Sequence, residues 1–338
     1  MRQSRNLWVL ALLVLTWSAC GGGGGEAKNP SGLFVVTQEG RAGYIDRQGR
    51  MVIPPQFDRA FGFTERLAVV QLGGRYGYID EEGRYVINPR YDDAFSFREG
   101  LAAVRVDGRI GYIDPKEKMV IPPQFDEGGD FAGGIARAVV GGRTGYIDKS
   151  GRFVINPRFD RGGKFSQGLA AVLVEGRWGY VNRDGEMVIE PQFDEAYEFA
   201  EDLALVKAGT VVGFIDKKGS FAISPRFENA SSFSEGLAAI GDGGRGGYID
   251  KSGEVVIPSQ FESVAPFAEG LARVRVDGRW GYIDREGKTV ISPQFDNAFD
   301  FNGGLAEAVL GGAQLYIDRE GKPVWNSGSP APAPGSSP

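Results

Sequence analysis

The tetrapeptide Gly-Tyr-Ile-Asp, or a near copy of it, recurs along this chain at a constant spacing of 34 residues. The copies begin at Gly43, Gly77, Gly111, Gly145, Gly179, Gly213, Gly247, Gly281 and Leu315, with no insertion or deletion between them. A fixed period of this size indicates a repeat architecture, in which one small unit stacks on its neighbours because it cannot bury a core alone. The period therefore predicts one continuous array over residues 33–325, although 338 residues would suffice for two domains.

Within each unit, glycine turns separate apolar runs of strand length. In the unit that begins at Leu169, LAAVLV is followed by the turn Glu175-Gly176, then by RWGYVN, a second turn and EMVIEP. Such closely spaced turns leave no room for a helix of ten or more residues, which excludes the helical hairpin repeats of the same period. A connector with two fixed aromatics ends the unit and has room for a short fourth strand. The pattern predicts an all-β chain of nine β-meander repeats.

The second turn of the unit reads D-x-x-G in most copies. Its aspartate can accept hydrogen bonds from turn amides, and its glycine can adopt a positive φ. One copy departs, because Asp114 is followed by Glu117 where the glycine should stand. We expect a distorted turn there.

The middle strand of the unit carries no charge in its central part: Trp178 and Tyr180 point one way, Gly179 and Val181 the other. A strand of this kind is buried on both faces, so the small sheets should stack face to face, as propeller blades do. The first and last units lack a polar cap, which favours ring closure. However, nine sheets exceed the usual 4–8 blades, and no strand is left over at either end to complete the other. We expect a propeller-like ring, with an open superhelical array as the alternative.

The N-terminus carries targeting signals. A short basic segment and the apolar run Leu7–Trp17, too short to span a membrane, predict a signal peptide over residues 1–19. Ser18-Ala19-Cys20 resembles the lipobox of bacterial lipoproteins, although Trp17 stands where that family usually has leucine. The resemblance implies lipid attachment at Cys20, a glycine-rich tether over residues 20–32, and outer-membrane sorting from Gly21. Plain secretion is the alternative. At the other end, residues 326–338 are rich in Pro, Ser and Gly and predict a disordered tail.

The composition excludes several classes of chemistry. The chain has no histidine and only one cysteine, Cys20. A Ser-His-Asp or Cys-His triad, a His/Cys zinc site and an internal disulfide are therefore excluded. A net charge of -6 works against nucleic-acid binding. We expect no enzyme activity and no cofactor.

The conspicuous charged residues fall in columns, one position per repeat. The turn aspartates and the connector aspartates could in principle serve acid–base chemistry or calcium, but local hydrogen bonding explains them better. The same holds for an arginine column, which we expect to form ion pairs rather than a stripe for a polyanion. The connector aspartates are Asp58, Asp92, Asp126, Asp160, Asp194 and Asp296, and the arginines are Arg41, Arg75, Arg109, Arg143, Arg177, Arg245 and Arg279.

Variable columns are free to meet a ligand. The position before the repeated glycine varies most and includes Tyr76, Ile110, Trp178 and Trp280. Exposed, these side chains would form an interaction patch; burial between blades is the favoured interpretation. No catalytic, cofactor, metal or binding residue is assigned from the sequence.

Two copies, Arg177-Trp178-Gly179-Tyr180 and Arg279-Trp280-Gly281-Tyr282, resemble the signature of the bacterial WG-repeat (KWG-repeat) family. The resemblance spans residues 33–325 and implies surface or secreted proteins that bind rather than catalyse. We therefore expect a membrane-tethered, non-enzymatic scaffold of the bacterial cell envelope that binds a protein or a glycan. One alternative is a polysaccharide hydrolase with two carboxylates, but the off-pattern acids Asp130, Glu190 and Asp202 are scattered. A purely structural envelope component is the other.

Overall fold

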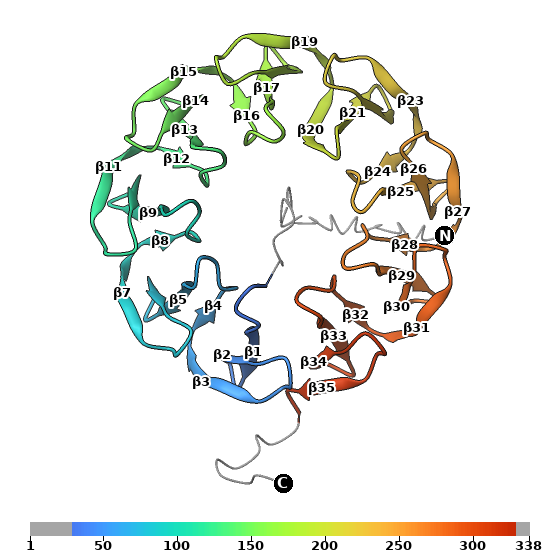
Figure 1. The fold of residues 1–338 in the computed structure, drawn as a ribbon, viewed down its shortest axis with the longest axis horizontal. Coiled ribbons are helices and arrows are strands. Elements are labelled where there is room, and N and C mark those ends of the chain that lie inside the picture. The colour runs from blue at the N-terminus through green and yellow to red at the C-terminus, as the bar shows by residue number, and fades with distance from the viewer. Residues whose placement is uncertain (1–28, 329–338) are drawn as a thin grey trace, which may run out of the picture.

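The computed structural model describes residues 29–328. Within this range, strands form nine antiparallel sheets arranged in a ring around a central opening, and no helix is present (Figure 1). No described segment is therefore a helix that could cross a membrane. The predicted all-β, propeller-like ring is confirmed, and the open superhelical alternative is not adopted. We number the sheets in chain order as blades 1 to 9.

Blades 2 to 9 have four strands each, which we call inner, second, third and outer; blade 1 lacks a described inner strand. The inner strands are β4 (Arg59–Ala60), β8 (Asp93–Ala94), β12 (Glu127–Gly128), β16 (Arg161–Gly162), β20 (Glu195–Ala200), β24 (Asn229–Ala230), β28 (Ser263–Val264) and β32 (Asn297–Ala298). The second strands are β1 (Phe34–Gln38), β5 (Ala68–Leu72), β9 (Ala102–Val106), β13 (Ile135–Val140), β17 (Ala170–Val174), β21 (Leu203–Ala208), β25 (Leu237–Asp242), β29 (Ala272–Val276) and β33 (Ala306–Leu310).

The third strands carry the repeated tetrapeptide, and the outer strands lie along the circumference (Figure 1). The third strands are β2 (Arg41–Ile45), β6 (Arg75–Ile79), β10 (Arg109–Ile113), β14 (Arg143–Asp148), β18 (Arg177–Val181), β22 (Val211–Ile215), β26 (Arg245–Asp250), β30 (Arg279–Ile283) and β34 (Ala313–Ile317). The outer strands are β3 (Met51–Phe57), β7 (Tyr85–Tyr91), β11 (Met119–Phe125), β15 (Phe153–Phe159), β19 (Met187–Phe193), β23 (Phe221–Phe227), β27 (Val255–Phe261), β31 (Thr289–Phe295) and β35 (Pro323–Asn326).

The predicted signal peptide, residues 1–19, lies outside the described residues, as do Cys20 and most of the predicted tether. The last four tether residues are described. Asn29 is buried and donates a side-chain hydrogen bond to the carbonyl of Leu33 at 3.1 Å. At the other end, β35 includes Asn326, the first residue of the predicted tail, and residues 329–338 lie outside the described range.

A bulge in the outer strand explains the repeated glycine. Between Ala42 and Tyr44 the third strand advances two residues, while its outer partner advances four, from Phe57 to Ile53. The extra outer-strand backbone lies directly over Gly43, where a Cβ atom would stand 2.5 Å from the carbonyl oxygen of Ile53. Only glycine allows so close an approach.

The ninth copy lacks this bulge and also lacks the glycine. Leu315 pairs with Asn326 and Tyr316 with Trp325, in step and without the bulge. A side chain at Leu315 therefore has room and is buried.

The third strands are buried on both faces in their central part, as predicted, because each packs against the blades on either side. The tyrosine of the tetrapeptide packs at a steep angle against a connector phenylalanine of the next blade, as Tyr44 does against Phe63 with ring centroids 5.0 Å apart and an interplanar angle of 58°. Its hydroxyl donates to a carbonyl of that same blade, in this case Phe61, at 2.8 Å. The same hydrogen bond is made by Tyr78, Tyr112, Tyr146, Tyr180, Tyr248 and Tyr282.

The ring closes by side-chain packing between blades 9 and 1, and no strand is shared between them. Phe34 packs edge-on against Tyr316 with ring centroids 5.4 Å apart. Gln314 accepts a hydrogen bond from the amide of Thr37 at 3.1 Å. The apolar cluster at this seam also contains Val36 and Leu305. Closure at nine blades is thus achieved with unequal end blades, one of three strands and one of four.

The expectation of a distorted turn at Asp114 is wrong. Glu117 adopts a φ of 64°, in the left-handed region where the glycines of the other copies lie, and its amide donates to the Asp114 carbonyl at 3.0 Å. The hydrogen bonds of the turn impose this conformation on a residue that does not favour it.

Candidate functional site

The arginine column forms ion pairs between neighbouring blades, as expected. Each arginine begins a third strand and contacts the connector aspartate 17 residues later, at the start of the next blade's inner strand. The pairs are Arg41–Asp58, Arg75–Asp92, Arg109–Asp126, Arg143–Asp160, Arg177–Asp194 and Arg279–Asp296. Arg245 donates instead to the carbonyl of Gln260 at 2.7 Å. These arginines are engaged within the ring, so the column gives no support to a polyanion site.

The connector aspartates have a second structural contact. The other carboxylate oxygen of Asp58 accepts the amide of Gly73, in the first hairpin turn of its own blade, at 2.7 Å. Asp160 accepts the corresponding amide of Glu175 at 3.0 Å. Each aspartate therefore links three segments of the ring.

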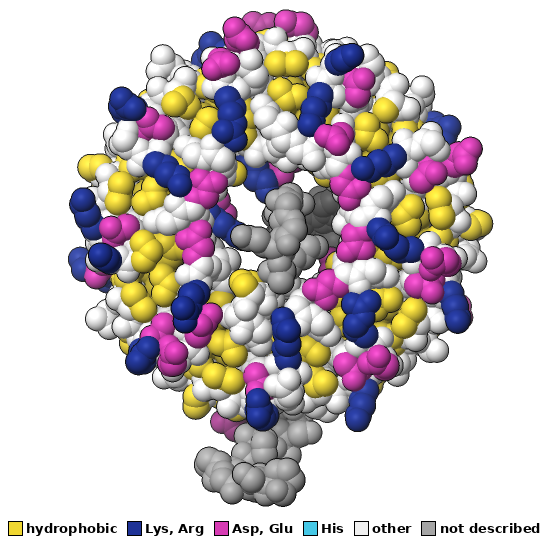
Figure 2. Space-filling model, viewed as in Figure 1, with side chains coloured by type: hydrophobic (Ala, Val, Ile, Leu, Met, Phe, Trp, Pro, Cys, Tyr) yellow, Lys and Arg dark blue, Asp and Glu magenta, His cyan; other side chains and the backbone are white. Residues whose placement is uncertain are grey.

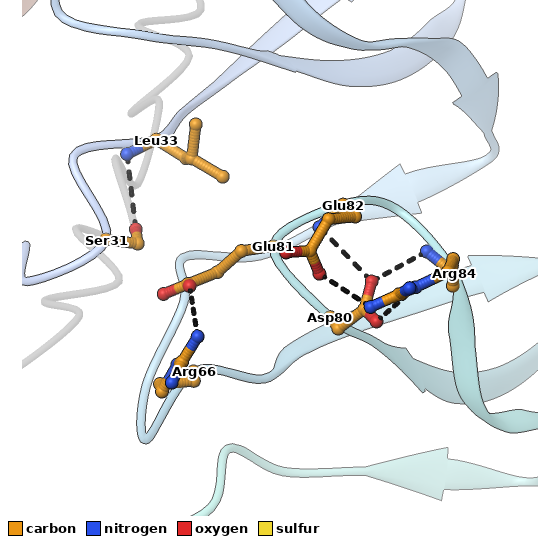
Figure 3. Close-up of polar contacts among 7 residues, drawn as sticks. All are labelled: Ser31, Leu33, Arg66, Asp80, Glu81, Glu82 and Arg84. Carbon is orange, nitrogen blue, oxygen red and sulfur yellow. Dashed lines mark hydrogen bonds and ion pairs between the residues drawn. The ribbon is translucent and has the colours of Figure 1, made fainter.

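The aspartates of the D-x-x-G turns are also used by the fold. Asp80 accepts the amide of Arg84 at 2.8 Å, and its other oxygen accepts the Arg84 guanidinium at 2.8 Å (Figure 3). Desolvation acts to raise the pKa of Asp80, but these hydrogen bonds together hold it below its usual range. In the copy at Asp148, the hydroxyl of Ser150 is the largest cause that lowers the pKa, to about 2. Carboxylates of this kind are local turn elements rather than general acids.

The large residues before the repeated glycine lie between blades. Ile110 is fully buried, while Tyr76, Trp178 and Trp280 are partly buried and packed against core clusters. They do not form the exposed patch that was the alternative to burial.

A second ring of contacts surrounds the opening and was not identified in the sequence. The loops after the inner strands carry glutamates in the left-handed conformation, with φ between 50° and 55°. Each glutamate accepts a backbone amide from the loop of the next blade, 34 or 35 residues on. They are Glu65, Glu99, Glu201, Glu235 and Glu269.

A basic side chain completes several of these loop contacts. Lys149 lies 3.2 Å from Glu99, and Lys251 lies 3.1 Å from Glu201. Desolvation acts to raise the pKa of Glu99, but the amide of Gly134 and the charge of Lys149 hold it below its usual range. The 34-residue spacing of these glutamates in the sequence indicates a shared structural role. Their contacts with the next blade, which define that role, are visible only in the structure.

The off-pattern acids are not brought together. Asp130 lies in the inner loop of blade 4, Glu190 in β19 and Asp202 in the loop before β21, where it pairs with Lys217 at 2.8 Å. Desolvation raises the pKa of Asp130, and the charges of Arg98 and Lys164 oppose this shift. Within residues 29–328, no three acidic or cysteine side chains are grouped so that they could hold a metal ion.

What remains is a set of exposed aromatics next to or within the inner strands. The residue two positions after the start of each inner strand varies between copies. It is a large aromatic in four copies, and in the others it is Gly129, Gly163, Ser231 or Ala265. The aromatics are Phe61, Phe95, Tyr197 and Phe299, with exposed fractions of 44 %, 37 %, 40 % and 42 %. The inner strands surround the central opening (Figure 1). This column combines exposure with variation between copies, as a binding surface requires.

Two open depressions lie away from this column. One, of about 340 Å³, is lined by residues that include Asp46 and Arg50; the other, of about 460 Å³, is lined by residues that include Tyr91 and Glu117. Each is lined by a single carboxylate, whereas glycoside hydrolysis usually needs two. Neither depression favours the hydrolase alternative.

The fold and these contacts define a nine-bladed propeller of tandem repeats, with blades joined by repeated ion pairs and tyrosine hydrogen bonds. The family model of the WG containing repeat matches residues 43–76, 76–109, 110–143, 145–178, 178–209, 213–245, 247–280 and 280–312. The chain therefore belongs to the WG-repeat family. No curated protein matches its sequence.

Several solved structures are similar to the chain at low sequence identity. The chain is similar to a eukaryotic initiation factor (TM-score 0.64, 10 % identity), over 87 % of this chain and 95 % of that one. It is also similar to dihydro-heme d1 dehydrogenase NirN in complex with DHE (TM-score 0.47, 14 % identity), over 89 % of this chain and 74 % of that one. The Kluyveromyces lactis protein Hsv2p gives a TM-score of 0.42 at 9 % identity, over 78 % of this chain and 93 % of that one. At 10 % identity, the likeness to the initiation factor concerns the fold alone.

Proposed function

We propose that this protein is a non-enzymatic binding scaffold whose axial opening takes a protein or glycan ligand. The observation that carries the proposal is the exposed aromatic column of Phe61, Phe95, Tyr197 and Phe299. Large exposed aromatics contribute much of the energy of interfaces, because they bury a large area with few rotatable bonds. The arginines, aspartates and tyrosines that recur in nearly every copy, by contrast, hold the blades together. They leave few uncommitted side chains for catalysis.

The charge of the surface agrees with a ligand other than nucleic acid. The net charge is -6, and acidic and basic side chains are interspersed over the face in view (Figure 2). Nucleic-acid binding usually requires a continuous basic stripe. A protein or a glycan can be held by aromatic and hydrogen-bonding groups without one.

We further propose that the scaffold is tethered to a bacterial membrane by a lipid on Cys20, at the outer membrane or the periplasmic face of the envelope. The lipobox-like Ser18-Ala19-Cys20 supports this. Replacing Cys20 with serine should move the protein from the membrane fraction to the soluble fraction. Unchanged membrane partitioning of Cys20→Ser would refute the lipid anchor and leave the binding proposal standing.

The binding proposal is tested by affinity capture from envelope extract. The test variant combines Phe61→Ser and Phe95→Ser, which introduce a residue that this column already holds at Ser231. The control combines Val154→Ala and Val188→Ala on outer strands, where the side chains are 42 % and 43 % exposed. We expect a protein or glycan to be enriched by the wild type and the control and lost with the double serine variant. Equal enrichment by all three would refute the role of the opening.

A further inference from the structure

Over blades 1 to 7, the outer strands alternate between two types of sequence, a period of two blades that the 34-residue repeat conceals. The next-to-last residues of β7, β15 and β23 are Arg90, Arg158 and Arg226. The remaining outer strands from β3 to β31 all have glutamine at this position. Those same three strands begin with an aromatic residue that packs edge-on against a phenylalanine of the preceding blade, as Tyr85 does on Phe57 at 6.2 Å. The three seams that follow blades 2, 4 and 6 therefore each have an arginine on the outer strand.

Two of these seams are alike and the third is not. Arg158 and Arg226 stack over the adjacent phenylalanine at 4.9 Å and donate to the carbonyl of the turn glycine in the next blade, Gly185 or Gly253. At the seam between blades 2 and 3, Glu117 replaces that glycine. Arg90 there pairs with the Glu117 carboxylate at 2.9 Å and lies 5.9 Å from the adjacent ring.

A second column breaks at the same seam. The residue after Arg90 is Tyr91, the single tyrosine in a column that is phenylalanine in every other copy from Phe57 to Phe295. A tyrosine hydroxyl is protonated at neutral pH, and burial, followed by the charge of Glu117, raises the pKa of Tyr91 further. Two substitutions in otherwise uniform columns thus bring a carboxylate and a phenol to one place.

These residues line the depression of about 460 Å³, together with Val106, Lys116 and Met119. The Arg90 side chain is 66 % exposed and uses one terminal nitrogen in its ion pair, so further N–H donors of the guanidinium are available. Lys116 adds an ammonium group and Met119 an exposed apolar surface. The depression therefore offers cationic donors, one carboxylate acceptor and an apolar wall.

We propose that this seam binds an acidic sugar unit, whose carboxylate contacts Arg90 and Lys116 while its ring lies against Met119 and Val106. A guanidinium matches the two oxygens of a carboxylate in geometry and charge. The remaining oxygen of Glu117 can only accept hydrogen bonds, and sugar hydroxyls supply the donors it needs. The site is separate from the axial opening, so its test does not depend on the proposed function.

Residues from other copies provide test variants that are compatible with the fold. Arg90→Gln, Tyr91→Phe and Glu117→Gly each restore the residue that the corresponding column holds elsewhere. Arg158→Gln makes the same change as the first at the seam between blades 4 and 5 and serves as the matched control. Sodium glucuronate is the probe, with glucose as its neutral counterpart and acetyl-glutamyl-glutamate as a peptide carboxylate, in calorimetric or NMR titrations of the purified protein at low salt.

We expect glucuronate to bind the wild type more tightly than glucose does. Arg90→Gln should weaken that binding by about tenfold or more, as the loss of a charge-assisted hydrogen bond does, and Arg158→Gln should leave it unchanged. Equal affinities for wild type and Arg90→Gln would overturn the proposal, as would an equal loss in Arg158→Gln. Tighter binding of the peptide than of glucuronate would overturn the assignment to a sugar.

Discussion

The hydroxyl of Tyr316 in blade 9 donates a hydrogen bond of 2.8 Å to the main-chain oxygen of Val35 in blade 1, 281 residues earlier. At seven of the eight other seams the equivalent tyrosine bonds to a carbonyl just after or within the next blade's inner strand, and the remaining seam has Phe214 in its place. The sheet of blade 1 begins with β1, without an inner strand in the described residues, and Val35 offers its carbonyl instead. The closing seam thus keeps the standard hydrogen bond of the ring with a different acceptor.

Removing this hydroxyl should weaken the closed ring. We predict that Tyr316→Phe lowers the free energy of unfolding by about 1 kcal/mol, the usual net contribution of a hydrogen bond, when measured by urea denaturation. Tyr180→Phe, at an interior seam with a bond of the same length to Tyr197, is the control and should cost a similar amount. If only the control were destabilised, the contact between the end blades would not form in solution.

The glycine of the tetrapeptide should be intolerant of any side chain. In Gly77→Ala the new Cβ would meet the carbonyl of Ile87 at 2.5 Å and the nitrogen of Pro89 at 2.6 Å. Because both atoms belong to the bulged backbone, relief requires the outer strand to move, and we predict a loss of at least about 3 kcal/mol, at the large end for a single substitution. Gly62→Ala is the control, since nothing lies within 4 Å of its Cβ position and its φ is not positive.

Gly62→Ala should be neutral or slightly stabilising, because it restricts the unfolded chain. Similar unfolding free energies for the two alanine variants would contradict the role assigned to the bulge.

Acid should affect the closing seam through Glu307. This side chain is half-buried and accepts a hydrogen bond from Gln314 at 2.9 Å; Gln314 in turn accepts the amide of Thr37. Desolvation raises the pKa of Glu307 above its usual value of 4.5, and the Gln314 bond opposes this only in part. A raised folded-state pKa means that the protonated form is favoured in the ring. Its stabilising effect is complete below pH 4.5 and is lost as the pH rises through the folded-state pKa.

We therefore predict that Glu307→Gln is more stable than the wild type at pH 7 and that this advantage disappears near pH 4. Thermal unfolding at both pH values checks the sign. A glutamine variant that is less stable at pH 7 would mean that the ionised carboxylate stabilises the seam.

Local patterns in the sequence predicted the strands and most of the turns, and they favoured a ring over an open array. Strand-length runs between glycine turns fix the meander, and the uncharged middle strands require neighbours on both faces. The sequence also shows that Leu315 replaces the glycine of the other copies, but it does not show why. The glycine is needed because of a bulge in another strand, and the bulge is missing from the last blade; both facts depend on strand register rather than on composition.

The candidate site shows a similar limit. Phe61 and Phe63 are two residues apart, which would place both on one face of a strand, yet Phe63 is buried and Phe61 is exposed. The strand ends at Ala60 and residues 61–63 have no regular secondary structure, so the alternation does not apply there. Variation between copies was the usable signal, since the Phe63 column is phenylalanine throughout and the Phe61 column is not.

Ring closure is tested most directly at Gly49, in the D-x-x-G turn of blade 1. A Cβ atom there would overlap the main-chain oxygen of Val324 in blade 9, whereas at Gly83, the same place in blade 2, it would meet only the flexible side chain of Ile53. The two glycines have nearly equal φ values of 77° and 81°, so the backbone strain of an alanine is matched. We predict from urea unfolding that Gly49→Ala is less stable than Gly83→Ala by about 2 kcal/mol, the scale of an overpacked contact. Equal stabilities would contradict the closed nine-bladed ring, because in an open array Val324 would not lie over Gly49.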